Sequence, residues 1–266
     1  MRSSLITKNI IIDNKKYTIF GDGCIEYMDV YEYRTIQLFK KYVKKGDTVI
    51  DIGANIGLTS IFFSTIASNV FSFEPNPIAF ELLEHNLKTN DITNVECYNI
   101  GVGNENKKST ITHYADNMSG GYVSEHHKIN QNDHATSDIT LARLDDIEWI
   151  KDFGCNLMKI DVEGYECEVI KGAKNLIEQY KPIIILEFNG KCIKMHNDDD
   201  LTLFFDTLRQ YFPVLYAVEW IKDKIVIKDL YNNDDVDFVI KNNMSSMSFL
   251  NVIAGFDSNI LKLLEE

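Results

Sequence analysis

The segment Val49–Gly57 limits the possible folds of this chain more than any other stretch of the sequence. Its β-branched run ends at Asp51, continues through a Gly-x-Asn-x-Gly turn that starts at Gly53, and leads into the helix-like segment Leu58–Ala67. A strand, a tight loop and a helix N-terminus in this order present backbone N–H groups to a ligand. Glycine suits such a loop because it tolerates positive φ and leaves space for a bulky ligand. The segment therefore predicts the first strand and the ligand-binding loop of an α/β sheet.

The length and charge of the chain restrict its partners. It has 266 residues, which suits one large α/β domain with additions, and we expect residues 1–266 to form a single domain. The 27 basic and 40 acidic residues leave a net charge of −13, which argues against nonspecific binding to nucleic acid or anionic membranes. We therefore expect a small-molecule or glycan substrate, no nucleic-acid partner and no membrane insertion. Composition leaves a homo-oligomer open.

The cysteines indicate neither disulfides nor zinc. Five of them are widely scattered, with no CxxC pair and no cysteine–histidine ligand spacing. The N-terminus lacks the pattern of a signal peptide, and the longest apolar runs are too short to cross a bilayer. We expect a reduced, cytoplasmic protein.

Strands and helices alternate along most of the chain, which predicts a doubly wound, mostly parallel sheet. After the first strand we expect strands at Val70–Phe73, Val95–Ile100, Asn156–Ile160, Ile183–Phe188, Val214–Val218 and Phe249–Ala254. The helical periodicity predicts helices at Tyr31–Val43, Asn76–Thr89, Glu163–Tyr180, Asp200–Phe212 and Asn259–Leu264.

Three regions depart from this alternation. Residues 1–30 form an N-terminal extension in which Asn9–Ile12 and Tyr17–Phe20 are expected to pair as a hairpin. Residues 103–138 are polar and long for a connection, so we expect an inserted loop that acts as a substrate lid. In the charged stretch 222–247, we expect Lys224–Ile227 to pair with Val236–Ile240 as an exposed hairpin.

The spacing of the glycine loop discriminates between ligands. A dinucleotide-binding loop would have glycine where Asn55 and Leu58 stand, and a phosphate-binding P-loop is absent. Glu74, at the end of the second strand, is placed to accept both hydrogen bonds of a ribose diol, which serves NAD and S-adenosylmethionine alike. Asp51 would suit the ammonium group of S-adenosylmethionine, and the loop N–H groups would suit its carboxylate. The alternative role for Asp51 is turn capping.

The third strand ends in a small-residue turn that is expected to lie against adenine. With this turn, the residues predicted to bind S-adenosylmethionine are Asp51, Gly53, Ala54, Asn55, Gly57, Glu74, Asn99, Ile100 and Gly101.

Further motifs follow in a fixed order. After Val49–Gly57 and the Phe-Glu-Pro run at Glu74 come Leu144–Asp146, the Lys-Ile-Asp-Val-Glu-Gly-Tyr-Glu run Lys159–Glu166, Val169–Ala173 and Pro182–Asn189. In these motifs the chain resembles the FkbM family of class I S-adenosylmethionine-dependent methyltransferases, from about Tyr31 to Ala254. The resemblance implies a Rossmann-like, seven-stranded sheet whose last strand is antiparallel. It also implies methyl transfer to oxygen on small molecules, often sugars or glycan precursors.

Acidic residues follow the fourth and fifth strands, where an open sheet places its reacting groups. In a metal-free site, Asp161 or Glu163 would take the acceptor's proton and Glu187 would bind the acceptor. In a magnesium site of the catechol O-methyltransferase type, Asp161, Glu187 and Asn189 would be the ligands. We favour the metal-free version. The structural alternatives are that Glu163 caps the following helix and that Glu187 pairs with Lys159.

Histidines offer another base. His196, after the fifth strand, is the best placed, so the catalytic candidates are Asp161, Glu163, Glu187 and His196. The histidines of the polar stretch are more often merely solvated, and Ser119–Tyr122 is a candidate hinge or substrate contact.

Other functions remain open on the sequence alone. A noncatalytic S-adenosylmethionine-binding protein would keep Asp51 and Glu74 without needing the acidic set. N-methylation of protein or nucleic acid usually shows an Asn/Asp-Pro-Pro-Tyr type motif, which the chain lacks. The glycine spacing disfavours a nicotinamide dehydrogenase.

Overall fold

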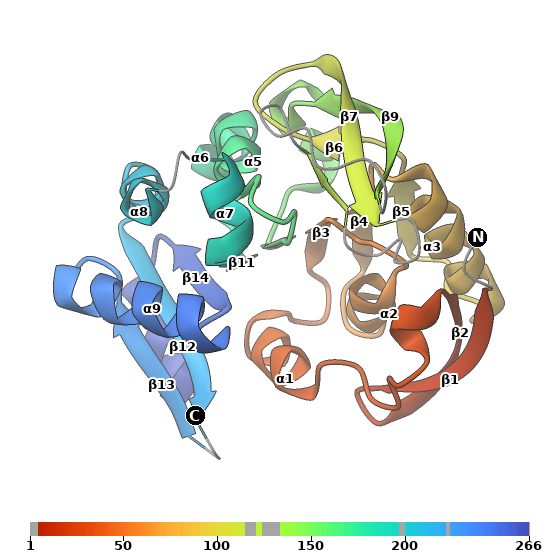
Figure 1. The fold of residues 1–266 in the computed structure, drawn as a ribbon, viewed down its shortest axis with the longest axis horizontal. Coiled ribbons are helices and arrows are strands. Elements are labelled where there is room, and N and C mark those ends of the chain that lie inside the picture. The colour runs from red at the N-terminus through yellow and green to blue at the C-terminus, as the bar shows by residue number, and fades with distance from the viewer. Residues whose placement is uncertain (1–4, 115–120, 124–133, 197–199, 222–223, 266) are drawn as a thin grey trace.

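The structure is a computed structural model, and it describes residues 5–114, 121–123, 134–196, 200–221 and 224–265 (Figure 1). A central sheet of eight strands has the order β13-β12-β14-β11-β10-β3-β4-β5. Its strands are β3 (Thr48–Ile52), β4 (Asn69–Phe73), β5 (Val95–Tyr98), β10 (Leu157–Ile160), β11 (Ile183–Glu187), β12 (Val214–Ile221), β13 (Lys224–Asp229) and β14 (Asn251–Gly255).

The sheet confirms the expected doubly wound topology. Strands β5, β4, β3, β10 and β11 are parallel neighbours, and β14 runs antiparallel between β11 and β12. These seven strands are the mostly parallel sheet with an antiparallel last strand that the motifs implied. Strand β13 adds an eighth, antiparallel strand along β12 at the edge of the sheet.

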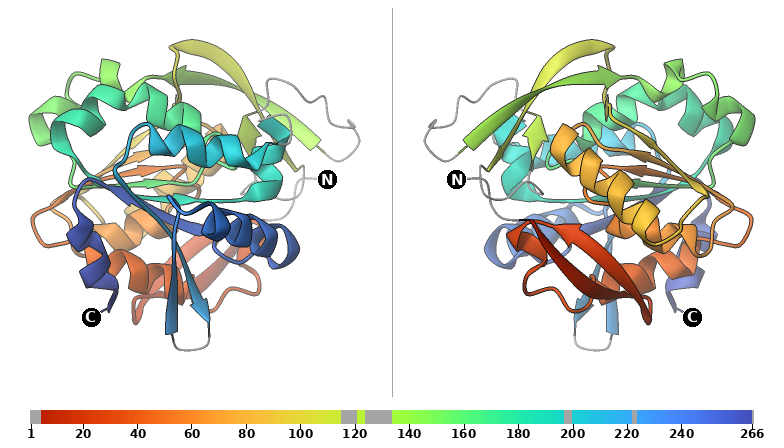
Figure 2. Two further views of the ribbon diagram at one scale, coloured as in Figure 1. Left: turned by 90° about the vertical axis from the view of Figure 1, so that its left-hand side faces the viewer. Right: turned by 90° about the vertical axis from the view of Figure 1, so that its right-hand side faces the viewer.

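Helices cover both faces of the sheet (Figure 2). They are α1 (Tyr33–Tyr42), α2 (Leu58–Ser64), α3 (Pro77–Thr89), α4 (Ile150–Phe153), α5 (Glu166–Gly172), α6 (Lys174–Tyr180), α7 (Gly190–His196), α8 (Leu201–Arg209), α9 (Asn233–Ser246) and α10 (Lys262–Glu265). Three short 3-10 turns span Gly23–Ile25, Leu144–Asp146 and Ser258–Leu261. Successive strand residues point to opposite faces, so Ile50 and Val49 join different apolar clusters, one under α5, α6, α8 and α9 and one under α1, α2 and α3.

One expected strand and one expected helix need correction. The expected hairpin partner Val236–Ile240 lies in α9, because Asn232 caps that helix and Val236 and Val239 are buried three residues apart. Strand β13 therefore pairs with β12 instead. The expected helix Glu163–Tyr180 is divided into α5 and α6 at Ala173.

The N-terminal hairpin is confirmed and belongs to the core. Strands β1 (Ile6–Ile12) and β2 (Lys15–Gly21) pair antiparallel, and Ile10 and Ile19 are fully buried. Asn86 of α3 and Asn90, which follows that helix, accept hydrogen bonds from the backbone of β2 at 2.7 and 3.0 Å. This packing, visible at the right of Figure 2, fixes the path by which the following segment reaches α1.

Residues 103–138 are not an irregular loop where the structure describes them. Strands β6 (Gly101–Val102), β7 (Lys107–Tyr114), β8 (Tyr122–Val123) and β9 (His134–Ala142) form a second sheet of order β6-β9-β7-β8. Its polar composition reflects alternation, since Ile111, Ile139 and Leu141 are buried while their neighbours face outward. The expectations for Ser119, Gly120, His126 and His127 fall outside the described residues, and the role of the stretch as a lid stays a prediction.

Two other expectations concern the chain as a whole. Within the described ranges, no helix has the length and apolar character needed to cross a membrane. Four cysteines, Cys97, Cys155, Cys167 and Cys192, are free thiols.

Candidate active site

The glycine loop between β3 and α2 is held in a left-handed conformation that explains its composition. Gly53, Asn55 and Gly57 have φ of 76°, 52° and 93°. A Cβ on Gly53 would lie 1.8 Å from the backbone oxygen of Asp161, so the loop and the end of β10 touch directly. Only glycine at position 53 permits this approach.

The N–H groups of the loop are already used by the protein. Those of Gly53 and Ala54 donate to the Phe73 carbonyl at 2.9 and 3.0 Å, and that of Gly57 donates to Ala54. The Asn55 N–H donates to Glu74 Oε2 at 2.8 Å, and the Ile56 N–H donates to Asn55 Oδ1 at 2.7 Å. In this conformation the loop N–H groups are satisfied within the protein, and their binding to a ligand carboxylate stays a prediction.

Glu74 lies at the end of β4, as predicted, and its carboxylate accepts hydrogen bonds from the backbone of two turns. One oxygen accepts from the Asn55 N–H and the other from the Asn76 N–H, both at 2.8 Å. The side chain is 6% exposed, and burial raises the pKa of Glu74 to about 7 despite these two hydrogen bonds. Each carboxylate oxygen has a second acceptor site, so Glu74 can still accept two hydrogen bonds from a ligand.

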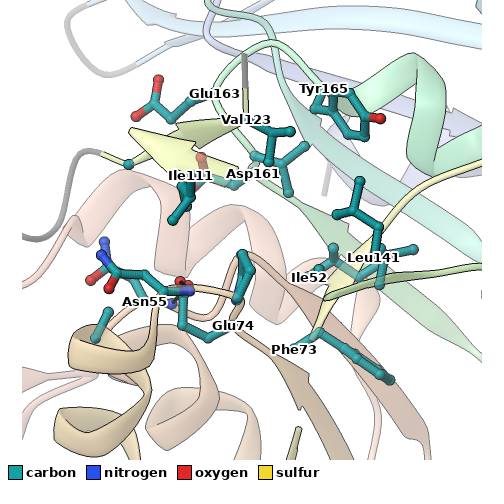
Figure 3. A pocket seen from close by; sticks show the side chains of 18 residues that line it. Ile52, Asn55, Phe73, Glu74, Ile111, Val123, Leu141, Asp161, Glu163 and Tyr165 are labelled. Atoms are coloured by element: carbon teal, nitrogen blue, oxygen red, sulfur yellow. Dashed lines mark hydrogen bonds between the residues drawn. The ribbon is translucent and has the colours of Figure 1, made fainter. Parts of the chain in front are cut away.

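A cavity that opens to solvent lies over the glycine loop and Glu74 (Figure 3). We call it the loop cavity. Of the residues predicted to bind the cofactor, it is lined by Gly53, Asn55, Glu74 and Gly101. The second sheet supplies its opposite wall through Ile111, Val123 and Leu141. Sequence reasoning missed these apolar residues because they belong to the polar stretch that was expected to be a loop.

The other predicted cofactor residues support the loop cavity without lining it. Asn99 donates through Nδ2 to the carbonyls of Glu74 and Pro75 at 2.9 and 3.2 Å, and so fixes the end of β4. Ile100 packs against the main apolar cluster, and Ala54 lines a neighbouring cavity.

Asp51 lies beneath the loop. It is fully buried, accepts a 2.7 Å hydrogen bond from Ser60 Oγ and lies 3.3 Å from Lys159 Nζ. The contact between Asp51 and the cofactor's ammonium stays a prediction, since in this structure the carboxylate is held by groups of the protein. Asp51 anchors the loop through Ser60 and Lys159.

Lys159 of β10 connects the ends of β3 and β10. Its Nζ lies 3.3 Å from Asp51 Oδ1 and 3.3 Å from Asp161 Oδ2, and donates to the Gly53 carbonyl at 2.8 Å. Burial lowers the pKa of Lys159, but the two carboxylates outweigh burial and raise the pKa above its usual range. Glu187 is therefore not the partner of Lys159, contrary to one of the structural alternatives.

The turn after β10 presents two carboxylates. Glu163 and Gly164 have φ of 54° and 98°, and the buried carboxylate of Glu166 accepts from the N–H groups of Val162 and Gly164 at 3.3 and 3.1 Å. Helix α5 begins at Glu166 after Tyr165, so Glu163 does not cap it. The turn instead places Asp161 and Glu163 in the lining of the loop cavity.

Asp161, Glu163 and Glu187 form an acidic cluster. One carboxylate oxygen of each lies within 4.8 Å of the others. Burial raises the pKa of Glu187 well above its usual value, and the neighbouring charges of Asp161 and Glu163 add to the rise. Burial and Asp161 likewise raise the pKa of Glu163. Such carboxylates are suited to take up a proton near neutral pH.

The predicted magnesium ligands are brought together only in part. Asp161 and Glu187 meet, but Asn189 donates through Nδ2 to Glu163 Oε2 at 3.3 Å. The three carboxylates of the acidic cluster are the oxygen set that could hold a divalent cation. His196 is the last residue of α7, and its side chain lies outside the described part of the structure.

A second hollow, which we call the acceptor cavity, adjoins the acidic cluster. It is lined by Tyr31, Glu32, Lys159, Asp161 and Glu187, and Asp161 also lines the loop cavity. Tyr31 and Glu32 precede α1, and their contribution was not foreseen, because no motif marks them. The N-terminal hairpin brings them here through backbone hydrogen bonds from Ile11 to Asp29 and from Tyr31 to Ile11, at 2.9 and 3.0 Å.

Comparison with known proteins agrees with this arrangement. The model of the Methyltransferase FkbM domain matches residues 51–213, which is more than half of the chain. A curated relative, Methyltransferase 1 of Beauveria bassiana, is 25% identical over 142 residues, which cover 47% of this chain and 57% of that protein. Hexuronic acid methyltransferase AglP of Haloferax volcanii is 29% identical over 157 residues, covering 58% and 61%. The chain thus spans about three fifths of the length of these relatives.

The sequence identity to solved structures is lower than to these relatives. Methyltransferase FkbM from Methylobacillus flagellatus has 20% identity and a TM-score of 0.40, covering 60% of this chain and 36% of that one. SMU.1697c from Streptococcus mutans, in complex with SAH, has 10% identity and a TM-score of 0.47, covering 84% and 96%. The family match to residues 51–213 includes the glycine loop, Glu74 and the acidic cluster. The chain belongs to the FkbM family of S-adenosylmethionine-dependent methyltransferases.

Proposed function

We propose that the chain transfers the methyl group of S-adenosylmethionine to a hydroxyl of a sugar, glycan precursor or other small metabolite. The observation that carries the proposal is the position of Asp161, which lines both the loop cavity and the acceptor cavity. A carboxylate at this junction is in reach of a donor on one side and a hydroxyl on the other. The relative named as a hexuronic acid methyltransferase supports a sugar acceptor.

The loop cavity fits the cofactor of the family. Glu74 retains acceptor capacity for a ribose diol, and Ile111, Val123 and Leu141 form an apolar wall suited to an adenine ring. When bound, the cofactor supplies a methyl group on a positively charged sulfur, which is an excellent leaving group. The protein therefore has to orient the acceptor, exclude water and remove a proton.

We assign the proton transfer to Asp161. The acceptor oxygen forms its bond to the methyl carbon as the carbon–sulfur bond breaks, and the hydroxyl proton moves to a carboxylate. Lys159 fixes the orientation of Asp161 by their ion pair at 3.3 Å. Glu163 is the alternative base, since its carboxylate lines the same cavity. Glu187 would then accept a hydrogen bond from the acceptor.

A magnesium-dependent version of the reaction is favoured by one observation, the 4.8 Å cluster of Asp161, Glu163 and Glu187. A cation there would lower the pKa of the acceptor hydroxyl. Activity measured with a chelator and then with added magnesium separates the two versions. Unchanged activity under chelation supports direct proton transfer to a carboxylate.

The test of the proposed function is labelled methyl transfer from S-adenosylmethionine into fractionated cell extract, with identification of the product by mass and NMR. A methyl ether on a small hydroxylated product is the expected result. Cofactor binding without any labelled product would favour the noncatalytic alternative. A methyl group found on nitrogen would contradict O-methylation.

A further inference from the structure

Part of the acceptor cavity is formed by the ends of three neighbouring strands. Asp161 follows β10, Glu187 ends β11 and Asn251 begins the antiparallel β14, and all three residues line the cavity. Strand β11 lies between β10 and β14, and Glu187 is directly opposite Asn251 in the register. Side chains directly opposite each other on antiparallel strands project from the same face, with Cβ atoms about 5 Å apart. Glu187 and Asn251 therefore lie side by side in the wall of the cavity.

These two side chains carry polar groups that the protein leaves open. Glu187 Oε2 is buried and has no hydrogen-bond partner. Asp161 contacts the same carboxyl group, but a carboxyl group has several acceptor positions, and one contact does not fill them. Asn251 is half-buried, and among the described residues nothing forms a hydrogen bond with its side-chain amide. An acceptor oxygen and an amide donor are thus adjacent, and neither is satisfied by the other.

A hydroxyl group is suited to both partners at once. It has one O–H donor and two acceptor lone pairs, so it can donate to Glu187 and accept from the Asn251 amide. The match holds in either protonation state of Glu187, because a protonated carboxyl group can donate to the hydroxyl in turn. An ether or carbonyl oxygen only accepts, so it would leave an ionised Glu187 without a donor. The competing occupant is water, which the experiments below distinguish from a substrate hydroxyl.

Two tyrosines line the same cavity. Tyr33 is the first residue of α1 and is 59% exposed, so its ring is available to a ligand. The hydroxyl of Tyr31 lies 3.4 Å from Thr59 Oγ1, a contact that holds its ring in place. Aromatic rings pack against apolar surface while their polar tips keep hydrogen-bond partners. The cavity therefore combines aromatic surface for the C–H face of a ring with open polar groups for hydroxyls.

We infer that Asn251 is a specificity-determining residue that binds, with Glu187, a second hydroxyl of the acceptor while a first hydroxyl is methylated at Asp161. This inference rests on the proposed function and narrows the acceptor to polyhydroxylated rings such as sugars. Neighbouring strands are about 4.8 Å apart, so hydroxyls bound at β10 and at the β11–β14 pair are separated on the scale of one sugar ring. Asn251 lies outside the family match to residues 51–213, so this contact belongs to a part of the chain that the family model does not cover.

The first test needs no variant. The acceptor is isolated by the labelled transfer into cell extract, and analogues of it are prepared that each lack one of the hydroxyls that are not methylated. We expect removal of one of these hydroxyls to lower kcat/KM about tenfold or more, because Glu187 and Asn251 then lose their shared partner. An acceptor with a single hydroxyl, or equal turnover of all the deoxy analogues, would overturn the inference, the second result indicating that water occupies the position.

The second test compares Asn251→Ala with Asn69→Ala on the same acceptors. Asn69 is the matched control, because it is also half-buried and also begins a five-residue strand, yet it lines neither the loop cavity nor the acceptor cavity. We expect Asn251→Ala to lower kcat/KM for the acceptor about tenfold and to turn over the sensitive deoxy analogue nearly as well as the acceptor. Affinity for S-adenosylhomocysteine, measured by calorimetry, should be unchanged. Full discrimination by Asn251→Ala would contradict the role of Asn251.

Asn251→Leu keeps the second test decisive if circular dichroism shows that the alanine variant is not folded. Leucine fills a similar volume in the strand and has no amide, so the same loss of discrimination is expected. A folded Asn251→Leu protein that still discriminates would overturn the inference.

The outcomes separate this inference from the proposed function. Absence of any labelled product would overturn the enzyme activity and, with it, the inference. A methyl ether on an acceptor that has no second hydroxyl would confirm O-methylation and overturn the inference alone.

Discussion

Lys159 Nζ lies 3.3 Å from Asp161 Oδ2 and 3.3 Å from Asp51 Oδ1, so a single buried ammonium joins the glycine loop to the catalytic candidate. The same nitrogen donates to the Gly53 carbonyl at 2.8 Å. These three contacts link the end of β3 to the end of β10. We therefore expect cofactor binding and acceptor activation to depend on the same residue, Lys159.

Replacement of Lys159 by methionine should destabilise the protein and abolish activity. The change leaves the fully buried Asp51 carboxylate without its cation, and breaking a buried pair in this way costs about 3–5 kcal/mol. Urea unfolding measures the loss. Lys174→Met is the control, because the Lys174–Glu178 pair is exposed and 3.9 Å apart. Equal stability of the two variants would contradict the anchoring role of Lys159.

Replacement of Glu74 by glutamine should weaken binding of S-adenosylhomocysteine by about 1–3 kcal/mol. An amide has one acceptor oxygen, so it cannot serve Asn55, Asn76 and a ribose diol together. Calorimetry gives the affinity, and circular dichroism checks the fold. If Glu74→Gln binds the ligand as tightly as the control Glu81→Gln, on the exposed face of α3, the cavity over the loop does not hold the ribose.

Substitution of Gly53 by alanine should be among the most damaging single-methyl changes in the chain. The new Cβ would lie 1.8 Å from the Asp161 carbonyl oxygen, and φ of 76° is unfavourable for alanine. We expect lower thermal stability and loss of activity together. Gly23→Ala, where a Cβ meets no atom within 4 Å, should retain both. A stable Gly53→Ala protein would show that the contact between loop and β10 is not tight.

The stability of the protein should fall as pH rises from about 4.5 to about 7. Burial raises the pKa of Glu166 from 4.5 to about 7, so in this window the folded state binds more protons than the unfolded state. The unfolding free energy then decreases as pH rises, and the decrease ends above the pKa of Glu166 in the folded state. Glu166→Gln can still accept from Val162 and Gly164 and should show a shallower slope in urea unfolding. Identical slopes would contradict a buried, protonated Glu166.

Sequence patterns predicted the main sheet because its strands are buried, apolar and separated by helices of regular period. They predicted Glu74 and the acidic cluster because both follow strand ends, where parallel strands converge. The prediction of a strand at Val236–Ile240 was wrong because the spacing of this short apolar run suits either a strand or a helix. The N-cap at Asn232 favours the helix.

Other features depend on contacts that are distant in sequence. Asp51 turned inward because Lys159, more than a hundred residues later, supplies a buried partner. Glu32 reaches the site only through the packing of the N-terminal hairpin on α3. The sequence did not predict the second sheet because polar residues of its outer face dominate the composition of this stretch. Local periodicity carries no information on such pairings.

The most direct test of the account is the effect of Asp161→Asn on turnover and on cofactor affinity, measured on the same preparation. The amide preserves shape but cannot take a proton, so kcat for labelled methyl transfer should fall by about 10²–10⁴-fold. The affinity for S-adenosylhomocysteine should remain close to that of the unchanged protein. Unaltered turnover, or an equal loss of turnover and affinity, would contradict the assignment of proton transfer to Asp161.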